Sequence, residues 1–176
     1  MDAKVGIMDD KVRIAGIVKE SIVDGPGLRL VVFAQGCRHN CPGCHNPETH
    51  SFDGGYIISI ESILKCVREN PLLDGITLSG GEPFEQAGSF AELARLVKLM
   101  GLSVMTYSGY TYEEISAKAA DRPDWKKLLD QTDILVDGRF ELKNRSLELR
   151  FRGSTNQRII DVVRTKSENR IVLADI

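Results

Sequence analysis

Three of the four cysteines fall within eight residues, with the spacing Cys37-x3-Cys41-x2-Cys44. Thiolates at these separations on a tight loop can converge on one metal cluster, and Gly36 and Gly43 relieve crowding of the backbone. Ordinary iron–sulfur clusters take four cysteines, so three leave one iron without a protein ligand. Because catalytic metal sites keep an open position that structural sites close, the loop favours a catalytic iron–sulfur centre.

A structural zinc site is the alternative for the same loop. All three histidines of the chain, His39, His45 and His50, lie inside the loop or just beyond it. One of them could complete a Cys3His zinc site, which is a common structural ligand set. Cys66 stands apart in an apolar stretch with helical periodicity, where we predict a buried helix residue that acts as a small hydrophobe.

A second motif, Gly80-Gly81-Glu82-Pro83, follows a short apolar segment that is typical of a strand. Its glycines let a ligand approach the backbone, and Glu82 places a carboxylate at the edge of the expected sheet. Alone, this tetrapeptide could be an ordinary turn with a solvated glutamate. Together with the cysteine loop upstream, it favours the iron–sulfur interpretation over zinc.

Strand-like and helical segments alternate along the chain. Strands are expected at residues 12–18, 28–33, 75–78, 102–107, 134–136, 159–163 and 171–174, and helices at 59–69, 90–100, 113–120 and 125–129. This alternation is typical of βαβ units that build a parallel sheet. The units are too few to close an eight-stranded barrel. The predicted fold class is therefore α/β, an open partial (β/α) barrel with a mostly parallel sheet.

The polar loops that follow three of these strands are residues 37–44, 80–83 and 137–138. In open and closed α/β folds alike, functional residues lie just beyond the carboxyl ends of the strands. Loops far apart in the sequence are thus expected to meet at one shared site.

Composition narrows the class of protein further. The chain has 176 residues, of which 42% are hydrophobic and 27% charged, which fits a single folded domain spanning residues 1–176. No apolar run has bilayer length and the start lacks the apolar block of a signal peptide, so we expect a cytoplasmic protein without a membrane partner.

The formal net charge is −2, too close to zero to argue for a nucleic-acid partner. Residues 139–170 are locally basic, with nine Lys or Arg against four Asp or Glu. This stretch is either a solvated charged surface or a docking face for an acidic partner.

At this point the sequence resembles the radical S-adenosylmethionine enzymes, through the cysteine spacing and through Ser79-Gly80-Gly81-Glu82-Pro83. It is more narrowly similar to the glycyl-radical activating enzymes, through the segments DGPGLR at 24–29 and CHNPET at 44–49. Among these, the anaerobic ribonucleoside-triphosphate reductase activating proteins fit best, through residues 107–110, 133–138 and 150–158. The resemblance covers roughly residues 13 to 161.

The resemblance implies a [4Fe-4S] cluster on Cys37, Cys41 and Cys44, with S-adenosylmethionine chelated to the iron that lacks a cysteine. It implies that an electron, expected from a flavodoxin- or ferredoxin-like donor, cleaves S-adenosylmethionine to a 5′-deoxyadenosyl radical. That radical would take a hydrogen atom from a glycine of the anaerobic ribonucleoside-triphosphate reductase. A pyruvate formate-lyase type of activase, or another radical S-adenosylmethionine enzyme, is an alternative, and a zinc-binding interaction module is a more distant one.

The resemblance also implies roles for individual residues. It assigns the methionine amino end of the cofactor to Gly80, Gly81 and Glu82, the adenine to the backbone around Gly43, Cys44 and His45, one wall of the cofactor pocket to Asp137, and the substrate peptide to Asp24. The residue after the third cysteine is often aromatic in the superfamily, and His45 keeps a planar face at that position.

Overall fold

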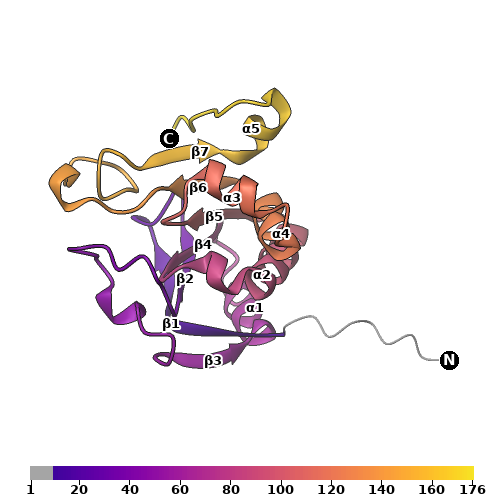
Figure 1. Ribbon diagram of the computed structural model, residues 1–176. Coiled ribbons are helices and arrows are strands. Elements are labelled where there is room, and N and C mark those ends of the chain that lie inside the picture. The colour runs from indigo at the N-terminus through magenta and orange to yellow at the C-terminus, as the bar shows by residue number, and fades with distance from the viewer. Residues whose placement is uncertain (1–9) are drawn as a thin grey trace.

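The computed structural model describes residues 10–176 (Figure 1). The strands are β1 (Lys11–Ser21), β2 (Arg29–Ala34), β3 (Tyr56–Ser59), β4 (Gly75–Gly80), β5 (Ser103–Tyr107), β6 (Ile134–Asp137) and β7 (Arg158–Asp161). The α-helices are α1 (Ile60–Arg68), α2 (Ala87–Leu99), α3 (Tyr112–Lys118), α4 (Pro123–Gln131) and α5 (Val162–Glu168), and short 3-10 turns lie at Pro47–Thr49, Pro83–Gln86 and Leu142–Asn144.

The strands form one open, seven-stranded sheet in the order β3-β1-β2-β4-β5-β6-β7. β2, β4, β5 and β6 pair in parallel, whereas β1, β3 and β7 pair antiparallel with their neighbours. Because β3 is antiparallel to β1, which is antiparallel to β2, β3 shares the direction of β2, and five of the seven strands run the same way. The predicted α/β class, an open partial (β/α) barrel with a mostly parallel sheet, is confirmed.

The two faces of the sheet have different surroundings, because one packs against the helices and the other lines a cavity. Leu30, Val32 and Ala34 of β2 are fully buried and belong to the core between the sheet and the helices. The alternate residues of the same strand point to the opposite, inner face, where Phe33 lines a cavity. Figure 1 shows α1 to α4 gathered on one side of the sheet, while two long loops, at about 35–55 and 138–157, extend from the other side.

The inner face is closed at the amino-terminal end of β2 by Arg29, which is only 1% exposed. Its Nε donates to Thr77 Oγ1 at 2.7 Å, and its terminal nitrogens donate to oxygens of Pro26 and Ser103. Burial lowers the pKa of the guanidinium. Thr77 Oγ1 in turn donates to the carbonyl oxygen of Asp24 at 2.8 Å, so the buried arginine holds the turn at 24–27 against the sheet.

Two predicted helix boundaries have the capping residues expected from the sequence. Ser59 caps α1, because its side chain accepts from the Ser62 N–H, and Gly101 follows α2 with a φ of 81°, the left-handed conformation that ends helices. Cys66 lies on α1 as predicted, but it is partly buried rather than buried, packed against the edge of the core.

Three elements near the sheet edges differ from the sequence-based expectations. The predicted strand at 159–163 ends at Asp161, whose side chain accepts from the Arg164 N–H at 2.9 Å and starts α5. The predicted strand at 171–174 makes a single bridge, between Ile160 and Leu173. Strand β3 was not predicted. Within residues 10–176, no helix has both the length and the apolar character that a bilayer crossing requires.

Candidate active site

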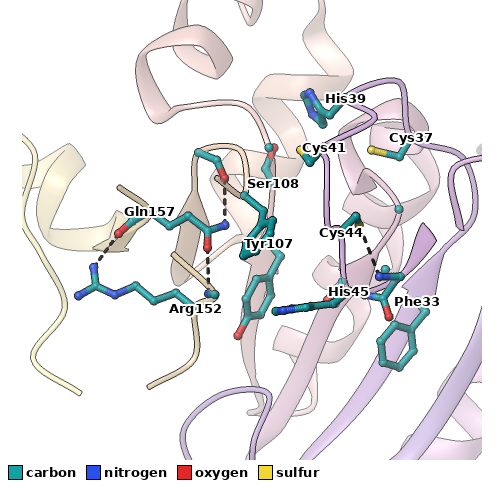
Figure 2. A pocket seen from close by; sticks show the side chains of 18 of the residues that line it. Phe33, Cys37, His39, Cys41, Cys44, His45, Tyr107, Ser108, Arg152 and Gln157 are labelled. Atoms are coloured by element: carbon teal, nitrogen blue, oxygen red, sulfur yellow. Dashed lines mark hydrogen bonds between the residues drawn. The ribbon is translucent and has the colours of Figure 1, made fainter. Parts of the chain in front are cut away.

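One cavity of about 500 Å³ lies on the inner face and at the carboxyl ends of the parallel strands (Figure 2). Its walls include the three clustered cysteines, Gly80 and Gly81 after β4, Ser108 and Gly109 after β5, and Gly138 after β6. The loops predicted to share one site therefore do surround one cavity.

The cysteine loop is held in shape by its own backbone. The Gly36 N–H donates to Thr49 O at 2.8 Å and the Cys37 N–H donates to His50 O at 3.1 Å, which closes the loop at its base. The Gly81 N–H donates to Ala34 O at 2.7 Å, so the end of β4 is attached to the strand that leads into the loop. These bonds fix the relative positions of the two sequence motifs.

Cys37, Cys41 and Cys44 are reduced, partly buried and on the cavity wall. Figure 2 shows them grouped at one end of the cavity. Burial raises the pKa of Cys37 to about 11 and also raises the pKa of Cys41. Burial thus favours the neutral thiols, whereas a bound metal ion would favour the thiolates, as in metal sites. The Asn46 N–H donates to the sulfur of Cys44 at 3.4 Å, the kind of hydrogen bond that tunes iron–sulfur centres.

A single-ion zinc site fits this arrangement less well. Within residues 10–176, no three His, Cys, Asp or Glu side chains are grouped for one ion. His39 uses both ring nitrogens elsewhere, with Glu82 and with Arg139, and the ring of His45 packs 5.1 Å from that of Phe140. A cluster, in which each thiolate would take a separate iron, suits three cysteines grouped at one end of the cavity.

Gly80 and Gly81 bring bare backbone to the cavity next to the cysteines. Gly80 has a φ of +87°, and a Cβ on Gly81 would meet Gly36 O at 2.6 Å. Only glycine fits there. The wall is therefore able to present carbonyl and N–H groups to a ligand without an intervening side chain.

Glu82 is fully buried and its side chain turns away from the cavity wall. Its carboxylate accepts from Ser108 Oγ at 3.0 Å, from the Gly109 N–H at 2.9 Å and from the Phe84 N–H at 3.1 Å, and it pairs with His39 Nε2 at 2.8 Å. The carboxylate therefore joins the β4, β5 and cysteine loops, and direct contact with a cofactor stays a prediction.

Asp137 is likewise buried, with its carboxylate bound by Arg158 and by the Tyr112 N–H at 2.7 Å. The adjacent Gly138, not Asp137, lines the cavity. Of the residues expected at the adenine, Cys44 and His45 lie on the wall, whereas Gly43 packs behind them, with Leu142 2.9 Å from where its Cβ would be.

Asp24 lines the cavity beside Val23, and its Oδ2 accepts from Ser21 Oγ at 2.5 Å. The nearby Tyr107 is mostly buried, and this burial, together with the negative charge of Asp24, raises the pKa of its phenol. Tyr107 therefore stays protonated and donates to Phe151 O at 2.6 Å. The turn predicted for the substrate peptide thus lies on the wall of the same cavity as the cysteines.

The sequence indicated only a charged surface or docking face for the loop between β6 and β7, whereas in the structure this loop forms another wall of the cavity. Phe140, Phe151, Arg152 and Gln157 line the cavity from this loop, and Figure 2 shows Arg152 and Gln157. Gln157 organises it, because its Nε2 donates to Gly138 O at 3.0 Å and its Oε1 accepts from the Gly153 N–H at 3.0 Å. The sequence signal that could have indicated this role is the position of Gln157 directly after the run Gly153-Ser154-Thr155-Asn156.

The basic stretch at 139–170 is partly neutralised within the fold. Arg158, Arg164, Lys166 and Arg170 form ion pairs with carboxylates. Arg150 is exposed and packs over the ring of Phe151, 5.3 Å from its centroid. Much of the predicted excess charge is therefore compensated locally, and the exposed arginine lies on the loop that walls the cavity.

Residues 23–160 match the model of the 4Fe-4S single cluster domain family, which defines the class of this fold and site. The anaerobic ribonucleoside-triphosphate reductase-activating protein of Vibrio cholerae is 34% identical over 146 residues, 77% of this chain and 89% of that protein. Its counterpart from Escherichia coli strain K12 is 30% identical over 150 residues, 77% of this chain and 90% of that protein. The chain belongs to the family of anaerobic ribonucleoside-triphosphate reductase-activating proteins.

The pyruvate formate-lyase-activating enzyme of Clostridium pasteurianum is 40% identical over 130 residues, 70% of this chain. This chain spans only 50% of the length of that relative. Among solved structures, QueE from Escherichia coli matches with a TM-score of 0.46 and 18% identity, over 57% of this chain and 54% of that chain, a likeness too distant to bear on fold or function.

Proposed function

We propose that this chain is an iron–sulfur activase that generates a glycyl radical on the anaerobic ribonucleoside-triphosphate reductase. The observation that carries the proposal is that three cysteines and the bare Gly80–Gly81 backbone share one cavity. The similarity to reductase-activating proteins along nearly their whole length supports the choice of partner. The chain would act as one radical S-adenosylmethionine domain in the cytoplasm, with a flavodoxin- or ferredoxin-like electron donor and with neither nucleic acid nor membrane as a partner.

When bound, a [4Fe-4S] cluster and S-adenosylmethionine would supply one-electron cleavage of the sulfonium and abstraction of a hydrogen atom from the target glycine. The protein holds and shields the reactants. Cys37, Cys41 and Cys44 would hold the cluster through their thiolates, and the bare Gly80–Gly81 backbone would receive the methionine end of S-adenosylmethionine.

Other residues around the cavity would orient the cofactor and exclude water. The planar ring of His45, fixed against Phe140, offers a face to adenine. Phe151, held by Tyr107, covers the side of the cavity toward the β6–β7 loop. Glu82 and Asp137 set the positions of the loops around the cofactor from behind the wall. A closely packed wall is needed because a primary carbon radical would abstract hydrogen from nearby C–H or S–H groups other than the target glycine.

The test is anaerobic reconstitution followed by incubation with a reductant, S-adenosylmethionine and the purified reductase. We expect about four irons per chain, formation of 5′-deoxyadenosine, and a glycyl radical signal on the reductase in electron paramagnetic resonance. Pyruvate formate-lyase is assayed in parallel, because the Clostridium relative activates that enzyme by name. Radical formation on pyruvate formate-lyase alone would reassign the partner, and zinc without iron after reconstitution would refute the proposal.

Asp24 is expected to act on the substrate peptide rather than on the cofactor, because it lies on the cavity wall and its backbone is fixed by Thr77 and Arg29. Asp24→Ala should leave slow uncoupled cleavage of S-adenosylmethionine within about two-fold while lowering the glycyl radical yield roughly ten-fold, the cost of one charge-assisted hydrogen bond. The ratio of 5′-deoxyadenosine to radical spins measures this. A wild-type ratio would show that the turn is structural only.

A further inference from the structure

His39, the histidine inside the cysteine loop, connects that loop to the loops that follow β4, β5 and β6. We propose that His39 is the positioning residue that holds the iron–sulfur loop in its cluster-binding shape, and that it acts through Glu82. The contacts that hold the loop lie within this chain, and only the expected effect of His39 on a cluster rests on the proposed function.

The side chains of His39 and Glu82 are 5% and 0% exposed. Their Nε2 and Oε2 atoms are 2.8 Å apart, and Arg139 Nε lies 3.2 Å from His39 Nδ1. Because an arginine can only donate, Nδ1 must be the acceptor and the ring proton sits on Nε2, where it is donated to Glu82. The imidazole therefore bridges a fixed donor and a fixed acceptor on two different loops.

Packing leaves the ring no alternative position nearby. It meets the ring of Tyr110 edge-on, with centroids 4.4 Å apart. A Cβ on Gly109 would come within 2.4 Å of the imidazole. His39 therefore fills the space that the missing side chain of Gly109 leaves. Its ring is in close contact with the loop after β5.

Glu82 is itself held in place by further hydrogen bonds. Its carboxylate is also bound by Ser108 Oγ and the Gly109 N–H, both of which belong to the loop after β5. The neighbouring side-chain link from the cysteine loop, Arg38 to Glu85, involves an arginine that is 65% exposed, and exposed ion pairs contribute little. His39 is therefore the main side-chain anchor of the segment between Cys37 and Cys41.

The test uses the metal-free protein, so it does not depend on activity or on the identity of the partner. Trypsin cuts after Arg38, in the segment that His39 anchors. His39→Ala should accelerate this cleavage roughly ten- to a hundred-fold, because loss of a buried charge-assisted hydrogen bond raises the open population by about that factor. His39→Gln, whose amide can still donate to Glu82, should restore most of the resistance.

The matched control is His50→Ala, since His50 also lines the cavity but its side chain makes no hydrogen bond within residues 10–176. Each rate is divided by that of a peptide spanning residues 33–44 with the same substitution, which removes the preference of trypsin for the residue after Arg38.

Arg139→Ala, which removes only the outer hydrogen bond, should give a smaller acceleration and serves if His39→Ala does not fold. Unchanged cleavage in both His39→Ala and Arg139→Ala would overturn the proposal.

A spectroscopic readout separates loop positioning from general stability. After reconstitution without S-adenosylmethionine, the His39→Ala cluster should lose iron to a chelator several-fold faster than wild type and give an altered electron paramagnetic resonance spectrum when reduced. Cys66→Ala, whose side chain lies outside the cavity wall, should match wild type in both measurements. If His39→Ala shows fast trypsin cleavage but a wild-type spectrum and wild-type iron loss, the anchoring of the loop stands and its effect on the cluster is refuted.

Discussion

Replacement of Cys37, Cys41 or Cys44 by alanine is expected to abolish assembly of the cluster, with iron and sulfide falling to background in each single variant. In the proposed site each thiolate would hold a separate iron, so the two remaining cysteines could not retain a cubane against loss to solvent. The backbone bonds at the base of the loop do not involve the sulfur atoms, so the variants should still fold. Iron and sulfide are quantified after anaerobic reconstitution, with circular dichroism to verify the fold.

Cys66→Ala is the matched control for these variants. Cys66 lies on α1, packed against the core and outside the cavity wall, and its replacement should leave the iron content at the wild-type value. A normal cluster content in any of the three loop variants would contradict the ligand assignment. Loss of the cluster in Cys66→Ala with an intact fold would point to a fourth cysteine ligand.

The second large effect is expected at Glu82, whose buried carboxylate serves four donors on three segments. Glu82→Ala leaves these donors without an acceptor, and each buried unsatisfied group costs about 1–3 kcal/mol. Even a combined loss of about 3 kcal/mol would lower the melting temperature of the metal-free protein by roughly 6–12 °C for a chain of this size. Thermal unfolding followed by circular dichroism measures the shift.

Glu82→Gln distinguishes the structural role of this residue from direct contact with the cofactor. Glutamine keeps the shape and one acceptor oxygen but removes the charge, so its melting temperature should lie between those of wild type and Glu82→Ala. Equilibrium dialysis on the reconstituted protein then gives the affinity for S-adenosylmethionine. Weaker binding with near-normal stability would indicate contact with the methionine amino group, whereas an unchanged melting temperature in Glu82→Ala would contradict the network described above.

The elements with strong local signals could be predicted from sequence. The apolar periodicity of α2 and the serine cap of α1 locate those helices. The parallel strands β2, β4 and β5 appear as short apolar runs because both of their faces are covered. The order of polar loops after these strands was enough to predict that the cysteines and Gly80–Gly81 lie at one cavity.

The edge elements carry weaker local signals. Strand β3 has four residues of intermediate or high exposure, so neither burial nor alternation marks it. The β-branched run Ile159–Val163 is typical of a strand, yet Asp161 in its centre caps a helix and the competing capping signal prevails. The antiparallel placement of β7 depends on pairing with β6 across the long loop at 138–157, which no local pattern contains.

The directions of the side chains in the site could not be predicted from the sequence either. The motif placed Glu82 at the correct edge of the sheet, but the donors that turn it away from the cavity come from Ser108, Gly109 and His39, far along the chain or in another loop. Asp137 is drawn to Arg158 in the same way. Sequence spacing locates a loop, whereas the orientation of a buried carboxylate depends on partners that only the folded chain assembles.

The backbone frame of the cysteine loop bears on what exposure to air does to this protein. Oxygen destroys exposed iron–sulfur clusters, and in proteins whose fold depends on the metal the polypeptide would collapse with it. Here the loop base is closed by hydrogen bonds from Gly36 and Cys37 to Thr49 and His50, and none of these bonds passes through a metal ligand atom. We therefore expect that, if the proposed cluster were lost to oxygen, these hydrogen bonds would persist and the folded loop could take up a new cluster without resynthesis of the chain.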